Sequence, residues 1–306
     1  MLAFTGARSP ILPSMRRYYP FFVTLTLLFG ISAVFFPMFK PPRGNPASAS
    51  AAAAVVSPYK YNFYVQDTLY ESGSMNQTTS PYWWVNSGAK LILFDGKGET
   101  IQGTLPITDP WRIAYATANP RDTDNGAHPQ NIFRLVSRST WNNVRLEASY
   151  YIAADNFSPS ANRNASNGLL LMSRYSMDGQ TLYYAGLRVD GTAILKKKIN
   201  GAYYTMAQKK IFPGTYSISA ANGTSRNLLP HNVWLRLRSD TVTNSDGSVT
   251  VKLSMQSPLG SGWQSLLTAT DRGEFGGTAP ITGARYTGIR TDFMDVKFDD
   301  FLAQNL

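Results

Sequence analysis

Residues 181–206 constrain the fold more than any other part of this sequence. They read TLYYAGLRVDGTAILKKKINGAYYTM and contain two dipeptides, Asp190-Gly191 and Asn200-Gly201, that are typical of two-residue β-turns. Asn, Asp and Gly tolerate the positive φ angles that such turns require. Because β-branched and aromatic residues flank both dipeptides, the segment predicts three adjacent antiparallel strands.

The register of these strands predicts which side chains share a face. Two-residue turns would pair Tyr184 with Lys197, and Lys197 with Tyr204. Side chains alternate between the faces of a sheet, so Tyr184, Arg188, Lys197 and Tyr204 are expected on a polar outer face and Leu187 in the core.

The same register carries a difficulty of its own. It places Lys196 and Lys198 on the core side, beside Tyr183 and Tyr203, where both lysines would have to reach out at the sheet edge. A slip of one residue would exchange the two rows of side chains. Both registers are therefore compatible with the sequence.

The rest of the folded part repeats this pattern of short alternating runs, and no long segment shows a helical period. The chain has 306 residues and no cysteine, which leaves ample length for a large core. We expect an all-β, two-sheet antiparallel jelly-roll sandwich over residues 58–306. Its strands are predicted near residues 90–94, 112–116, 131–137, 143–153, 168–175, 181–189, 192–199, 202–208, 233–239, 248–256, 264–270, 284–290 and 294–302.

The N-terminal region has a different composition. Residues 18–39 form an uncharged, mostly apolar run of 22 residues, which is long enough to span a bilayer and longer than the apolar region of a signal peptide. We expect a cytoplasmic N-terminus at 1–17, a single-pass transmembrane anchor at 18–39 and a Pro/Ala/Ser linker at 40–57. This arrangement predicts a membrane protein whose C-terminal domain lies outside the cytoplasm; cleavage of the leader is the alternative.

The C-terminal third contains a recognisable order of motifs. Trp234 opens the run WLRLRSD, Asp246-Gly247 forms a turn, SVTVKLSMQ and Trp263 follow, and the chain closes with YTGIRTDFMDVKFDDF. Over residues 169–302 this order resembles the concanavalin A-like lectin/glucanase superfamily, which includes laminin-G-like modules and jelly-roll polysaccharide lyases. The resemblance implies a jelly roll and a carbohydrate partner. It does not choose among lectin, binding module, hydrolase and lyase.

The polar face of the central strands is the first candidate binding site. Tyrosine rings stack on sugar rings, and Lys and Arg pair with carboxylate or sulfate groups, so the expected ligand is an acidic polysaccharide. The alternative is a solvated sheet face whose Tyr and Lys side chains pack across strands. Three residues on neighbouring strands could extend the binding site, although structural ion pairing is the commoner role for such residues: Arg134, Arg145 and Glu147.

Catalysis is the second candidate function. The paired carboxylates of a glycoside hydrolase, as in the E-x-D-x-x-E motif, are absent, whereas a uronate-cleaving lyase requires only a cation and groups that move protons. Tyr184 and Arg188, with His128 or His231, could supply these groups for a β-elimination reaction. A structural or adhesive surface module is the third reading.

The charge and the metal ligands complete the sequence-based expectations. The net charge is +10, but the first 45 residues hold only basic charges and the remainder has 24 basic against 19 acidic residues, which excludes a nucleic-acid footprint. With two histidines and no cysteine, a zinc site is not expected. No cofactor is expected, although Asp122 and Asp124 in one loop are compatible with a structural Ca²⁺ ion.

Overall fold

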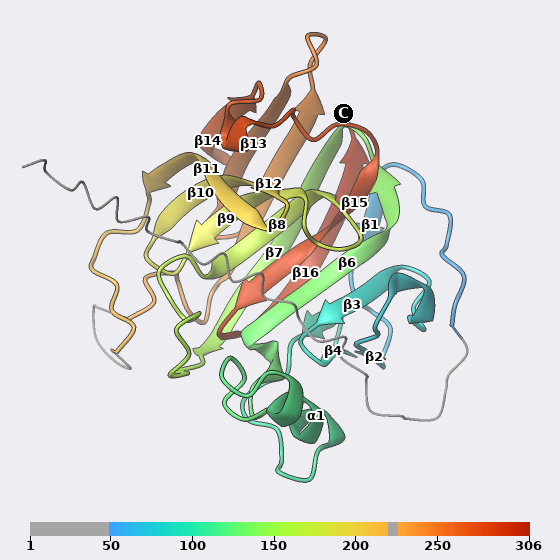
Figure 1. Cartoon of the computed structure of the whole chain (residues 1–306), viewed down its shortest axis with the longest axis vertical. Helices are drawn as coiled ribbons and strands as arrows, with labels where there is room; N and C mark the ends of the chain where they lie inside the picture. Colours follow the sequence, from blue (N-terminus) through green and yellow to red (C-terminus); the bar gives the residue numbers. More distant parts are fainter. Residues whose placement is uncertain (1–48, 220–225) are drawn as a thin grey trace, which may run out of the picture. The chain divides into compact units, whose positions relative to one another are not determined.

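The computed structural model describes residues 49–219 and 226–306, which form a two-layered β-sandwich (Figure 1). The predicted cytoplasmic segment 1–17, the predicted anchor 18–39 and most of the predicted linker lie outside the described residues. Within the described ranges, no helix has the length and apolarity needed to cross a bilayer.

One layer is a nine-stranded antiparallel sheet with β7 and β16 at its centre. The short strand β1 (Tyr59–Tyr61) pairs with β16 and lies outside the main order of strands. The order of the other strands is β14 (Gln264–Asp271), β13 (Val249–Gln256), β12 (Trp234–Thr243), β7 (Val144–Asp155), β16 (Met294–Asn305), β5 (Lys97–Glu99), β4 (Lys90–Phe94) and β2 (Asp67–Tyr70).

The other layer is a seven-stranded antiparallel sheet that contains the predicted three-strand segment at one edge. Its order is β11 (Ala202–Lys210), β10 (Thr192–Ile199), β9 (Leu182–Arg188), β8 (Gly168–Tyr175), β15 (Arg285–Asp292), β6 (Ile132–Trp141) and β3 (Trp83–Ser87). The described helices are short: α1 (Pro110–Ala118), η1 (Met75–Gln77), η2 (Pro129–Asn131) and η3 (Phe275–Gly277).

The inner faces of the two sheets form the main hydrophobic core. Large aromatic side chains fill its centre; the rings of Phe133 and Phe298, from opposite sheets, stack with their centroids 5.5 Å apart. Full burial of a side chain of this size is worth about 1.5–3 kcal/mol. This packing confirms the expected all-β, two-sheet sandwich.

One predicted strand is wrong. Residues 112–116 belong to helix α1, because Asp109 caps its N-terminus by accepting a hydrogen bond from the Trp111 backbone N–H and Pro110 occupies the first turn. The strands β1, β2, β3 and β5 were also not predicted, because strands of three to five residues are too short to show a clear alternation of apolar and polar side chains. The remaining predicted strands match observed ones to within a few residues.

The register of the three-strand segment corrects the sequence-based pairing. At the first turn the Gly191 N–H donates to the Arg188 carbonyl over 2.8 Å, and Gly191 has φ 77° whereas Asp190 does not adopt positive φ. The loop is therefore a three-residue turn closed by a glycine bulge. Tyr184 consequently pairs with Lys196, one residue away from the expected Lys197.

The second turn follows the expectation. Asn200 and Gly201 have φ 49° and 82°, as a two-residue turn requires, and Lys197 pairs with Tyr204. One hairpin thus has the expected register and the other is slipped by one residue. Because of this slip, Tyr184 of β9 shares the outer face with Lys196 and Lys198 of β10, whereas Lys197 points toward the core.

Candidate functional site

The outer face of the seven-stranded sheet gathers aromatic and basic side chains from five strands. We call it the cationic face, and it consists of Arg134 on β6, Tyr184 on β9, Lys196 and Lys198 on β10, Tyr203 on β11 and Arg290 on β15. Side-chain alternation places these residues opposite the main core. Tyr184 also belongs to a second apolar cluster, separate from the main core, that includes Met172 and Ile194.

Arg290 is the centre of the cationic face. Its Nη1 donates hydrogen bonds to the hydroxyl groups of Tyr184, over 3.1 Å, and Tyr203, over 3.3 Å. Its Nε donates to the carboxylate of Asp292 over 2.8 Å. The guanidinium also lies 5.7 Å from the ring centroid of Tyr184, within cation–π range. These contacts fix the direction of the guanidinium.

Tyr203 is the exposed part of this cluster, with 49% of its surface accessible. Its ring stacks on the buried ring of Tyr184, with centroids 6.0 Å apart and an interplanar angle of 21°. The ammonium groups of Lys198 and Lys196 lie 5.1 Å and 5.9 Å from the Tyr203 ring centroid. An accessible ring is thus surrounded by positive charge.

The charges on the cationic face change the acidity of its tyrosines. Burial raises the pKa of Tyr203, but the positive charges of Arg290, Lys198 and Arg134 outweigh burial and lower that pKa to about 8. For Tyr184, which lies deeper, burial dominates and raises the pKa to about 12. Burial also lowers the pKa of Lys196 and of Lys198.

Arg134 adds to the positive charge because it lies directly opposite Arg290 in the pairing of β6 with β15. Its Nη1 is 3.4 Å from the side-chain oxygens of Asn86 and Ser87. Two arginines side by side repel one another unless an anion lies between or beside them. The Asp292 carboxylate pairs with Arg290 at 2.8 Å, and the carboxylate of Glu71 interacts electrostatically with Arg134.

Two residues that the sequence placed on this face lie on the opposite side. Lys197 is completely buried between the sheets, 2.9 Å from the Asp271 carboxylate, because the bulged first turn moves it out of the row of Tyr184. Tyr204 pairs with Lys197 and packs its ring against Gly276. Neither contributes to the cationic face.

Other predicted binding residues have structural partners. Arg188 shares the face of Tyr184, but it forms an ion pair with Asp190 at 2.9 Å and donates to the Ala165 carbonyl. Arg145 and Glu147 lie on the other sheet, in β7, and therefore do not join Tyr184. Each is paired there, Arg145 with Asp240 and Glu147 with Arg236 and Arg238.

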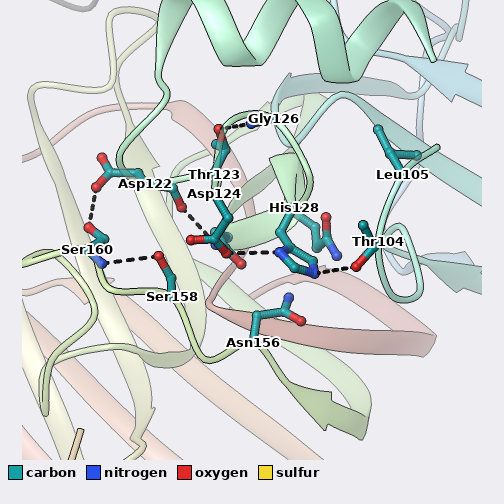
Figure 2. A network of polar contacts seen from close by, with 12 residues as sticks. Thr104, Leu105, Asp122, Thr123, Asp124, Gly126, His128, Asn156, Ser158 and Ser160 are labelled. Carbon is teal, nitrogen blue, oxygen red and sulfur yellow. Dashed lines mark hydrogen bonds and ion pairs between the residues drawn. The ribbon is translucent and has the colours of Figure 1, made fainter. Parts of the chain in front are cut away.

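The two histidines do not reach the cationic face in this structure. His128 contacts Asp124 and Thr104 in the loops drawn in Figure 2. His231 lies 3.1 Å from Asp155, and its Nδ1 is 2.8 Å from the Leu229 carbonyl oxygen. Neither histidine is hydrogen-bonded or ion-paired to Tyr184 or Arg188, so the structure does not bring His128 or His231 together with these two residues.

The expected calcium ligands also have protein partners. The Asp122 carboxylate accepts a hydrogen bond from Asn162 and, as Figure 2 shows, one from Ser160, while Asp124 contacts His128. In the described ranges no three or more His, Cys, Asp or Glu side chains come together as a metal site would require.

Sequence reasoning missed Arg290, Tyr203, Lys196 and Lys198 as members of the candidate site. The sequence contained a signal for the two lysines. The register that exposes Lys196 and Lys198 buries one lysine, Lys197, whereas the alternative register buries two. Arg290 shares a strand face with Gly288 and Asp292 in the run GIRTD, where these three residues alternate with Ile289 and Thr291, a pattern typical of a strand with one polar face. Its position opposite Arg134 depends on long-range strand order, which local patterns do not specify.

Comparison with known proteins gives neighbours in structure only. No protein-family model matches the chain, and no curated protein matches it. Similar solved structures include the carbohydrate-binding module CBM66 from Bacillus subtilis, with 13% identity, 57% of this chain and 82% of that chain covered, and a TM-score of 0.38. A β-glucanase from Bacillus licheniformis has 8% identity, 83% and 100% coverage, and a TM-score of 0.42.

A third similar structure is the PL-14 alginate lyase from Aplysia kurodai, with 11% identity, 82% of this chain and 100% of that chain covered, and a TM-score of 0.37. By their names, these neighbours are a carbohydrate-binding module, a β-glucanase and an alginate lyase. Identities and TM-scores this low transfer no function to this chain.

Proposed function

We propose that this protein binds an acidic polysaccharide on the cationic face. The observation that carries the proposal is the exposed ring of Tyr203, which is bordered by Arg290, Lys196 and Lys198. A sugar ring stacks on an exposed tyrosine, and a carboxylate or sulfate two or three bonds away would meet the adjacent basic groups.

The direct test is isothermal titration of the full-length protein, held in mild detergent, with a polyuronate, a sulfated glycan and a neutral glucan. Binding to either anionic polymer, with affinity that falls as salt rises, supports the proposal. Equal binding of the neutral glucan would assign recognition to ring stacking alone. Absence of binding to all three would refute glycan recognition and favour a structural or adhesive module.

A second function, uronate-specific polysaccharide lyase, is favoured by one observation: Tyr203, whose pKa is lowered to about 8, lies beside Arg290. In β-elimination a cation neutralises the uronate carboxylate and a base removes the C5 proton. Tyrosinate at Tyr203 and the Arg290 guanidinium match these two roles. Release of unsaturated uronate, followed by its ultraviolet absorbance, would establish the lyase; binding without new absorbance would leave a binding module.

We also propose that residues 18–39 anchor the protein in a membrane with the domain outside the cytoplasm. The support is the uncharged run of 22 residues between Arg17 and Lys40. Alkaline carbonate extraction of cell membranes tests it: an integral protein stays in the pellet, and deletion of residues 18–39 releases it. Protease added to intact cells should cut the domain; protection from protease would place it on the inner side.

A further inference from the structure

A second group of chemically active side chains lies apart from the cationic face, in the loops before β6. His128 Nε2 is 3.0 Å from the Thr104 hydroxyl, and His128 Nδ1 is 2.9 Å from the Asp124 carboxylate (Figure 2). A hydroxyl, an imidazole and a carboxylate in this order have the connectivity of a nucleophile–base–acid triad. We propose that Thr104, His128 and Asp124 form a hydrolytic site for carboxylic esters.

The carboxylate determines the role of each imidazole nitrogen. Ionised Asp124 only accepts hydrogen bonds, so His128 Nδ1 carries the proton that it donates. In the neutral ring Nε2 is then the acceptor, and the Thr104 hydroxyl donates to it. This tautomer is the one that a general base requires in order to take a proton from a nucleophilic hydroxyl.

The exposure of the three residues fits a reacting site. Thr104 is exposed, whereas the His128 and Asp124 side chains retain only 20% and 21% of their accessible surface. A substrate could therefore reach the hydroxyl while the base and its carboxylate are shielded behind it. The backbone N–H of Thr104 donates to no acceptor within residues 49–219 and 226–306, so it is available to an oxyanion.

The loop that carries Asp124 and His128 has an uncommon conformation. Asp124, Asn125 and Gly126 have consecutive positive φ angles of 53°, 53° and 77°. The Thr123 hydroxyl accepts the Gly126 N–H over 3.1 Å, and the His128 N–H donates to the Thr123 carbonyl over 2.9 Å. Positive φ at non-glycine residues costs free energy and persists where surrounding bonds enforce it, often at functional sites.

Asp124 has a further property that a purely structural residue would not need. Its second oxygen, Oδ1, is buried and has no hydrogen-bond partner within the described part of the chain. A buried carboxylate oxygen without a hydrogen-bond partner destabilises the fold. Its charge is instead directed at His128, where it would stabilise the imidazolium that forms during acyl transfer.

The proposed reaction balances with water as the only co-reactant. Thr104 Oγ1 attacks the ester carbonyl carbon while its proton passes to His128 Nε2. The bond from the carbonyl carbon to the alcohol oxygen then breaks, and the alcohol leaves with the proton from His128. Water attacks the acyl-threonine, gives its proton to His128, and releases the acid as that proton returns to Thr104. Because Thr104 lies at the surface, the substrate class is a short acyl ester on an accessible alcohol, such as an acylated sugar.

Two measurements on the full-length protein test this proposal. The first is p-nitrophenyl acetate hydrolysis by wild type and by Thr104→Val, which removes the hydroxyl and keeps the shape. We expect a loss of about 100-fold or more, because the variant lacks the nucleophile of the triad, and recovery of activity in Thr104→Ser. The second is treatment with a fluorophosphonate, followed by mass spectrometry of peptides, which should place the adduct on Thr104.

Matched variants separate this site from general histidine reactivity. Thr108→Val removes another exposed hydroxyl in the same loop, and His231→Gln removes the second histidine; both should hydrolyse the ester at the wild-type rate. Asp124→Asn should reduce both hydrolysis and labelling. Equal hydrolysis by wild type and Thr104→Val, or a fluorophosphonate adduct that avoids Thr104, would overturn the proposal. Loss of this activity would leave glycan binding on the cationic face intact, so the two proposals fail separately.

Discussion

The ammonium group of Lys197 lies 2.9 Å from the Asp271 carboxylate, and both side chains are completely buried between the two sheets. The same carboxylate accepts the Tyr183 hydroxyl over 2.6 Å. Lys197 also donates to the carbonyls of Thr278 and Ala279, over 2.7 Å and 3.0 Å. Every charge in this cluster is therefore paired, and the cluster ties β10 to the segment that joins β14 to β15.

Lys197→Ala should destabilise the domain strongly, because it leaves the buried Asp271 carboxylate without its cation. Removal of one partner from a buried ion pair typically costs about 3–5 kcal/mol. Urea unfolding followed by tryptophan fluorescence measures the loss. Lys196→Ala, one residue away on the outer face, should stay within about 0.5 kcal/mol of wild type. Wild-type stability of Lys197→Ala would contradict this placement of the ion pair.

Lys197 also illustrates how far the sequence determined the site. The strands on either side of Asn200-Gly201, their pairing and the sandwich were predictable, since alternation and turn chemistry act locally. The bulge at Gly191 was not, because a three-residue and a two-residue loop fit the same Asp-Gly dipeptide. One residue of slip was enough to move Lys197 from the expected binding row into the core.

The remaining members of the site depend on contacts between distant parts of the chain. Arg290 and Arg134 are 156 positions apart and meet only because β15 lies between β8 and β6. The pairing of Glu147 with Arg236 and Arg238 has the same origin, and it assigns Glu147 to ion pairing within its own sheet. Local sequence patterns predict which face of a strand a side chain occupies, but they do not predict the order of strands in a sheet. The sequence therefore indicated a face with aromatic and basic side chains, but not which distant residues would meet there.

Lys196→Gln should weaken binding of an acidic polysaccharide several-fold, since it removes a cation beside the Tyr203 ring. A partly exposed ion pair contributes about 0.2–1 kcal/mol, so the effect should shrink as salt is raised. Titration calorimetry at two salt concentrations measures it. Lys252→Gln, an exposed lysine on β13 of the other sheet, makes the same change in net charge and should bind as wild type. An equal loss in both variants would indicate a general charge effect.

Binding should also weaken as pH rises through about 8, the pKa of Tyr203. Ionisation places a negative charge among Arg290, Lys196, Lys198 and Arg134 and beside Tyr184, which reduces the attraction for an anion. Tyr203→Phe should abolish this step, which ultraviolet titration of tyrosinate can follow in parallel. A lyase that uses Tyr203 as its base would respond oppositely, with activity that increases over the same range. A pH-independent affinity in wild type would remove Tyr203 from the site.

The stability of the domain should fall as pH rises from about 4.5 to about 7 because of Glu71. Burial raises the pKa of Glu71 from 4.5 to about 7, although it accepts hydrogen bonds from the Tyr115 hydroxyl, over 2.5 Å, and the Ala89 N–H, over 2.8 Å. The folded state thus keeps a proton that the unfolded chain has released, so the sign of the effect is destabilisation with increasing pH.

The full effect of Glu71 should be about 3 kcal/mol, the equivalent of its change in pKa. Glu71→Gln cannot ionise but retains an oxygen that can accept from Ala89 and Tyr115. The difference in unfolding free energy between this variant and wild type, measured at intervals from pH 4 to pH 8, isolates the contribution of Glu71 from that of other groups. The unfolding free energy of Glu71→Gln should increase relative to that of wild type as pH rises across this window; a constant difference would mean that Glu71 has the same pKa in the folded and the unfolded protein.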